Sequence, residues 1–258
     1  MTDKEILKDL RKYATAKSLA GQERVLDRLA GVEGIAEQLI PYLDHDDPDI
    51  AYASIMVLCR IGPSAAPAVG KLIEKIEDST LRSVAVSALA TIGPAAAPAI
   101  PSLIRVLKVA IKYKPVDHSA DPIPMPPVEI CDATSACSAL TAFGEAAKKA
   151  LPELRRCAGL HISEDFVGFL RLKAASAVWD ISGEAESAVQ VASDFLANPD
   201  WSPIDFMDGE CELTIDLLAK IGPPAASVIP VLQRAMSNAP ETVKTRLAEA
   251  LAKIDVQK

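Results

Sequence analysis

The sequence predicts an all-α fold, a right-handed α-solenoid of about six helical hairpins with a capping helix at each end. Two observations carry this prediction. A short turn motif recurs along the 258-residue chain with the same apolar flanks, and a proline follows it at a fixed offset. The composition agrees, because half of the residues are apolar and only 4 % are aromatic. Small aliphatic side chains of this kind suit tight packing between helices.

The turn motif marks the end of the first helix in each hairpin. An apolar residue stands four residues and one residue before the turn position, which places both on one helical face. Glycine suits the left-handed residue that ends a helix, and proline cannot continue one. The copies are Ile61-Gly62-Pro63, Ile92-Gly93-Pro94 and Ile221-Gly222-Pro223, with degenerate copies at Phe143-Gly144-Glu145 and Ile181-Ser182-Gly183.

The second helix follows each turn. Pro101, Pro152 and Pro230 stand eight residues after the turn glycine, and a leucine follows two residues later. Proline is tolerated there because the amides of a first helical turn have no acceptor within the helix. Each unit is therefore a first helix, a turn and a second helix. The charged segments Thr2 to Ala20 and Glu241 to Ile254 are predicted to cap the stack.

The segment from Ala88 to Ile104, with Ile92-Gly93-Pro94 and Ile100-Pro101, resembles the HEAT repeat, and in particular its short, phycobilin-lyase-like variety. The resemblance extends over nearly the whole chain from about Gly21. It implies a single solenoid domain over residues 1–258, of the kind that serves unrelated proteins as a binding scaffold.

Two insertions interrupt the regular repeat, at residues 114–128 and 198–209. Both connect the second helix of one hairpin to the first helix of the next. Such connections emerge along one edge of a solenoid, and insertions on one face are often binding loops. All three histidines, His45, His118 and His161, lie in connections of this type. We call the surface that these connections form the loop edge.

We therefore predict a protein-binding surface made of the loop edge and the second helices, which are expected to line the concave face. Trp201 and Phe206 bring more apolar surface to the second insertion than solvation requires. Three arginines share one repeat position, twelve residues after the turn, although Glu74 and Asp194 interrupt this ladder. The candidate contact residues are His118, Asp121, Met125, His161, Trp201, Phe206, Arg105, Arg156 and Arg234.

Two other functions are considered. Nucleic-acid binding or DNA repair on basic concave helices is disfavoured by the formal net charge of −8 and by the interrupted arginine ladder. A bilin lyase or isomerase activity is implied only by the repeat variety, and no nucleophile stands beside a candidate base. We predict a non-enzymatic protein with no cofactor.

The remaining features predict a cytoplasmic protein with no membrane segment. Five cysteines, an odd number without zinc or redox spacing, are expected to be reduced thiols. No short ligand spacing supports a zinc site from His118, Asp121, His161 and Glu164, so no metal site is predicted. The N-terminus lacks the apolar run of a signal peptide. The apolar stretch from Ala88 to Ile111 holds three prolines and is expected to be two buried helices joined by a turn.

Overall fold

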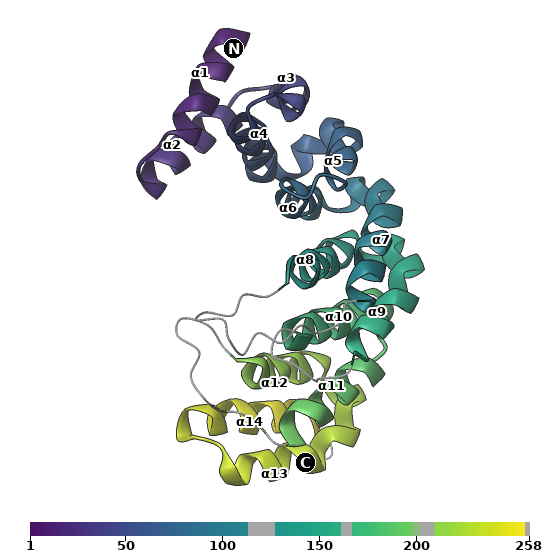
Figure 1. The fold of residues 1–258 in the computed structure, drawn as a ribbon. Helices are drawn as coiled ribbons and strands as arrows, with labels where there is room; N and C mark the ends of the chain where they lie inside the picture. The colour runs from purple at the N-terminus through teal and green to yellow at the C-terminus, as the bar shows by residue number, and fades with distance from the viewer. Residues whose placement is uncertain (113–126, 161–166, 198, 200, 202–208, 256–258) are drawn as a thin grey trace, which may run out of the picture. The chain divides into compact units, whose positions relative to one another are not determined.

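The fold is all-α, as the sequence predicts. The computed structural model describes residues 1–112, 127–160, 167–197, 199, 201 and 209–255. Over these residues every regular segment is an α-helix or a 3₁₀-helix (Figure 1).

The described residues form six helical hairpins between two end helices, which confirms the predicted number. The end helices are α1 (Asp3–Ala14) and α14 (Glu241–Ile254). The hairpins are α2 (Leu19–Ala30) with α3 (Ile35–Leu39) and η1 (Ile40–Asp44); α4 (Pro48–Ile61) with η2 (Gly62–Ala68) and α5 (Val69–Lys75); α6 (Arg82–Ile92) with η3 (Gly93–Ala99) and α7 (Ile100–Ile111); α8 (Val128–Phe143) with η4 (Gly144–Ala150) and α9 (Leu151–Ala158); α10 (Val167–Ser182) with α11 (Glu186–Ala197); and α12 (Glu210–Ile221) with η5 (Pro223–Val228) and α13 (Ile229–Asn238).

The turn glycines end the first helices as expected. Gly93 has φ 76° and ψ −142°, a conformation that residues with a side chain rarely adopt, and its N–H donates to the carbonyl of Leu89. Gly93 and Pro94 are the first two residues of the 3₁₀-helix η3, in which the alanines Ala96 and Ala99 are buried. The turn is thus a short 3₁₀-helix rather than a simple corner, and the second helix starts after it.

Three local predictions need correction. In the fifth hairpin the turn residue is Gly183, with φ 73°, and not Ser182, and α11 follows it without a 3₁₀-helix. The N-terminal helix ends at Ala14 rather than at Ala20, and α2 begins at Leu19, where the side chain of Ser18 accepts from the N–H of Gly21 and caps it. For the first of the six predicted hairpins no turn was located, although Ile40-Pro41 repeats the pair Ile100-Pro101.

The chain divides into two compact units. Unit 1 comprises Met1–Val106 and Ser138–Ala147, and unit 2 comprises Leu107–Cys137 and Lys148–Lys258. In unit 1, α4 packs on α6 and η2 on η3. In unit 2, α12 packs on α10 and α14, while α11 packs on α9 and α13. Each unit therefore has a first-helix layer and a second-helix layer. The single domain over residues 1–258 stays a prediction.

The buried apolar stripe lies between the two layers. Leu58 and Leu89 in unit 1 and Val178 and Leu218 in unit 2 are completely buried, as expected from their position four residues before the predicted turn. Complete burial of a leucine or valine side chain stabilises a fold by about 1.5–3 kcal/mol. The core is therefore repeated from hairpin to hairpin, as in a solenoid.

Two continuous helical stretches, Pro48–Lys75 and Arg82–Ile111, are apolar and long enough to cross a membrane by length and composition. Half of the apolar window in each stretch is buried inside the structure. Each stretch also contains a turn glycine, Gly62 or Gly93, and is a hairpin rather than one straight helix. The expectation that Ala88 to Ile111 forms two helices joined by a turn is confirmed.

Candidate binding surfaces

Five of the nine predicted contact residues, His118, Asp121, Met125, His161 and Phe206, lie outside the described residues. Residues 114–126 of the first insertion and most of the second insertion also lie outside them. The described part of the predicted surface is the set of helix ends from which these connections leave, together with Trp201, Arg105, Arg156 and Arg234.

A buried arginine joins two of these helix ends in unit 2. Arg171 lies in the first half of α10 and is 2 % exposed. Its Nε donates to the carbonyl of Ala158, the last residue of α9, at 3.0 Å. Its Nη2 forms an ion pair with Asp194, one turn before the end of α11. The C-terminal ends of α9 and α11 therefore contact the same side chain, that of Arg171.

Three further contacts lie at this anchor. The guanidinium of Arg171 lies 5.4 Å from the ring centroid of Phe195, a cation–π contact. The thiol of Cys211, at the start of α12, lies 3.9 Å from the carbonyl of Phe195. Asp194 also accepts from Gln190 within α11. The end of α11 is thus in contact with α10 and with the start of α12 just before the second insertion.

Trp201 is half-buried, so its ring is not freely exposed. The indole N–H is buried and has no hydrogen-bond partner in the described part of the chain. A buried tryptophan N–H usually finds an acceptor. Trp201 therefore carries an unsatisfied donor at the loop edge.

The three arginines of the predicted ladder have different surroundings. In unit 1, Arg105 donates to Glu77 at 2.7 Å and to the hydroxyl of Ser102 at 3.0 Å. In unit 2, Arg156 on α9 and Arg234 on α13 are exposed, and neither forms an ion pair with another described residue. Helix α11 packs between α9 and α13, so the two arginines are not on adjacent helices.

The five cysteines are free thiols, as predicted. Cys137, Cys157 and Cys211 are buried, whereas Cys131 is exposed, so the expectation that all of them fill the core holds only in part. Burial raises the pKa of Cys59 to about 11 and that of Cys157 to about 12. Thiols of this kind carry little thiolate at neutral pH and are poor nucleophiles.

Among the described residues, no group of three or more histidine, cysteine, aspartate or glutamate side chains could hold a metal ion. The possible zinc ligands His118, Asp121, His161 and Glu164 lie outside that part of the chain.

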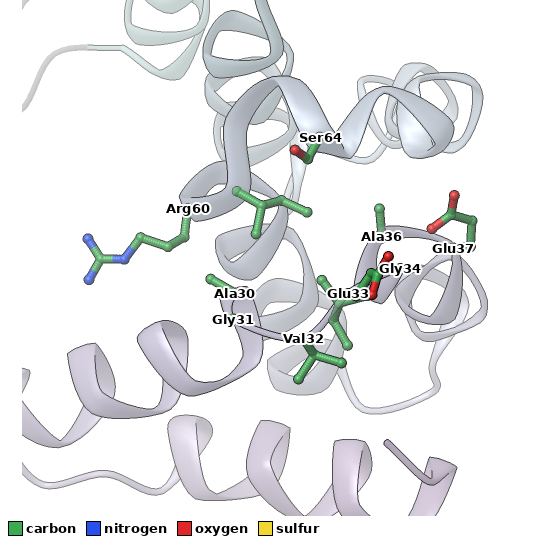
Figure 2. Close-up of a pocket in the computed structure, with 11 residues that line it drawn as sticks. Ala30, Gly31, Val32, Glu33, Gly34, Ala36, Glu37, Arg60 and Ser64 are labelled. Carbon is green, nitrogen blue, oxygen red and sulfur yellow. The ribbon is translucent and has the colours of Figure 1, made fainter.

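An open pocket of about 500 Å³ lies in unit 1, between the turn of the first hairpin and the turn of the second. Its lining comes from residues 30–37 and from Arg60, Ile61 and Ser64 (Figure 2). This pocket was not predicted, because the turn of the first hairpin lacks the Gly-Pro motif found at Gly62, Gly93 and Gly222.

Comparisons with known proteins agree with this architecture. Residues 36–111 match the family model for HEAT repeats, so this segment consists of HEAT repeats. A solved structure described as the complex of CpcE and CpcF of phycocyanin lyase from Nostoc sp. PCC7120 superposes with a TM-score of 0.54 at 16 % sequence identity. The alignment covers 99 % of this chain and 94 % of that one.

The likeness to the lyase complex shows a shared fold. An engineered protein is also similar, with a TM-score of 0.49, 19 % identity, and coverage of 98 % of this chain and 68 % of its own. A search among curated proteins found no significant match. The resemblance to HEAT repeats is confirmed for residues 36–111, and the likeness to the lyase complex shows a shared all-α solenoid fold.

Arg171 is the residue at these helix ends that sequence reasoning missed. It lies between Leu170 and Leu172, with Lys173 close by, and charged residues in such a segment look like solvent-exposed positions. The leucines on both sides of Arg171 are the signal that could have indicated a buried ion pair.

Proposed function

We propose that this chain is a non-enzymatic protein-binding module, and that its contact surface is the loop edge of unit 2 with the neighbouring second helices. The observation that carries the proposal is the anchor at Arg171. It fixes the end of α9 and the end of α11 to the same side chain, so the connections at 161–166 and 198–208 leave from neighbouring points. Binding residues are commonly found on loops that a rigid scaffold positions.

The protein class supports a macromolecular partner. HEAT repeats build extended surfaces by stacking hairpins, and such surfaces bind other macromolecules along their length. Trp201 combines partial burial with an indole N–H that has no hydrogen-bond partner among the described residues, and tryptophan is enriched among residues that dominate binding energy. The free thiols support a reducing compartment, and we place the module in the cytoplasm.

The charges favour a protein over a nucleic acid. Lys71 and Lys75 on α5 both contact Asp44, and Arg105 contacts Glu77. Acidic neighbours therefore neutralise these basic side chains of unit 1, and although Arg156 and Arg234 of unit 2 have no such neighbour in the described part of the chain, the formal net charge of −8 disfavours a phosphate backbone. A titration of labelled duplex DNA at low salt tests this point, and we expect no binding.

The lyase alternative has only the fold in its favour. The phycocyanin lyase complex shares 16 % identity with this chain, and a shared solenoid does not transfer an activity. The buried thiols with raised pKa values would be poor attacking groups for a chromophore. Covalent or tight binding of phycocyanobilin by the purified chain would revive this alternative.

Affinity capture from the native host tests the proposal. The intact chain is compared with a variant in which residues 114–126 and 199–208 are replaced by short Gly-Ser linkers. A control variant, Ser87→Arg, changes an exposed position of the first-helix layer. Far-ultraviolet circular dichroism first establishes that all three chains are equally helical.

We expect a protein that the intact chain and Ser87→Arg capture and the linker variant does not. Equal capture by the linker variant would show that the loop edge is not the contact surface.

A further inference from the structure

The pocket of unit 1 owes its shape to an unusual turn. In the second hairpin, η2 begins at Gly62 directly after α4 ends at Ile61, whereas the four residues from Gly31 to Gly34 separate α2 from α3. Helix α3 packs against η2, and the long turn beside it forms one wall of the pocket. The opposite wall is the end of α4 and the start of η2 (Figure 2). The two edges of this pocket therefore come from different hairpins.

The pocket has a mixed lining, in which polar atoms and apolar side chains both take part, and two exposed glutamates stand at its rim. Ile35 is buried, and Val32 and Ile61 are half-buried, so their side chains supply apolar surface. Glu33 and Glu37 line the same pocket and are exposed. Neither carboxylate forms an ion pair or hydrogen bond with another described residue. The rim thus carries two negative charges without a cation.

The only cation among the lining residues is already engaged. Arg60 forms ion pairs with Glu23 and with Asp27, the latter at 3.0 Å, and both partners lie on α2. Figure 2 shows its guanidinium pointing away from the other lining residues. Arg60 therefore does not offset the charge of Glu33 and Glu37 within the pocket.

We propose that this pocket is a docking site for a basic segment of a partner protein, with an arginine or lysine side chain seated between Glu33 and Glu37. The long stems of these side chains pack on apolar surface while their charged ends stay at the rim. Arginine is favoured because its planar guanidinium can contact two carboxylates at once. A volume of about 500 Å³ also accepts an apolar neighbour of that side chain, which Val32, Ile35 and Ile61 would contact.

This site is separate from the loop edge, because it lies in unit 1 at the turns within hairpins rather than at the connections between them. Its charge also selects a different partner segment. An acidic or neutral segment would leave both carboxylates without a counter-charge, and an acidic one would add repulsion. The proposal therefore stands or falls independently of the loop edge.

The test uses the full-length chain with labelled valine and isoleucine methyl groups. Three short peptides of equal length are titrated by nuclear magnetic resonance: one with a Leu-Arg core, one with Leu-Gln and one with Leu-Glu. We expect the arginine peptide alone to shift the methyl signals of Val32, Ile35 and Ile61. The shifts should weaken as salt is added, because the contact is at an exposed rim.

Two variants of equal charge change locate the effect. Glu33→Gln with Glu37→Gln should weaken arginine-peptide binding roughly three- to thirtyfold, the range expected for two exposed ion pairs. Glu186→Gln with Glu249→Gln removes two exposed carboxylates of unit 2 and should leave the affinity within about twofold. Ser64→Trp, at an exposed lining position, should block the pocket without disturbing the core.

Three outcomes would overturn the proposal. One is equal binding of the neutral peptide, and another is an equal loss of affinity in the two charge variants. The third is the absence of any shift at the pocket methyl groups. If spermidine shifts the same signals as strongly as the peptide, the pocket binds a small polyamine rather than a protein segment.

Discussion

Replacement of Arg171 by methionine should destabilise unit 2 by about 2–3 kcal/mol. The change leaves the carbonyl of Ala158 without its 3.0 Å donor and Asp194 without its counter-charge. A buried polar group without a partner costs about 1–3 kcal/mol, and breaking a buried ion pair costs about 3–5 kcal/mol. The value lies below the sum of these costs because the side chain of Asp194 is 34 % exposed and can be rehydrated.

Removal of the other partner of the ion pair, Asp194, should cost more. In Asp194→Ala the side chain of Arg171 stays 3 % exposed and keeps the carbonyl of Ala158 and the ring of Phe195 but loses its counter-charge, so we expect a loss of about 3–5 kcal/mol. The double variant Arg171→Met with Asp194→Ala should lose less free energy of unfolding than the two single variants lose together. The second change removes the group that the first left without its ion-pair partner.

Chemical denaturation followed by tryptophan fluorescence measures these losses. The two tryptophans, Trp179 and Trp201, both lie in unit 2, so the signal reports the unit that contains the anchor. Arg155→Met is the matched control, because Arg155 pairs with Glu184 at the surface of the same unit. An exposed pair of this kind contributes about 0–1 kcal/mol. If Arg171→Met costs no more than Arg155→Met, the anchor does not hold the helix ends.

Three further predictions concern the turns, the thiols and the surface charges. Gly93→Ala should destabilise the fold by about 1–3 kcal/mol because its φ of 76° is strained for alanine. Gly70→Ala, at an exposed helical position with open space around it, should stabilise the fold by about 0.4–1 kcal/mol. Thermal unfolding followed by circular dichroism checks both signs. Cys131 should be the first cysteine of the native chain to react with a thiol reagent. Because burial raises its pKa, the rate should keep increasing as the pH is raised above the usual thiol pKa. Mass spectrometry of the modified chain would contradict this prediction if a buried cysteine reacts first. Hydrogen bonds from Lys71 and Lys75 lower the pKa of Asp44 in the folded state. Its contribution to stability is therefore present above the unfolded pKa and is lost as the pH falls through the folded pKa. In an acid titration of stability, Asp44→Asn should not show this part of the decrease.

The sequence was sufficient for the repeat architecture because each turn requires a residue type that is visible in it. Gly62, Gly93 and Gly222 adopt positive φ values, and prolines begin the segments that follow. Hairpins without these residues were harder to place. The turn of the first hairpin has no Gly-Pro motif, and the turn residue of the fifth is Gly183, one position later than predicted.

The candidate surfaces were less predictable, because they depend on pairing across the hairpins. The position of Arg105 in the repeat indicated a free charge, but Glu77 on the neighbouring second-helix segment neutralises it. The role of Arg171 likewise depends on Ala158 and Asp194, which are distant in the sequence. Charge pairing of this kind follows from the stacking register, which a repeat pattern alone does not specify.

Hydrogen–deuterium exchange of the intact chain, with and without the protein that it captures, tests the central claim most directly. We predict that the partner slows exchange at the connections 113–126, 161–166 and 198–208 and at the ends of α9 and α11, while the first-helix layer is unchanged. Protection confined to the first-helix layer, or spread evenly over all hairpins, would contradict the assignment of the loop edge as the binding surface.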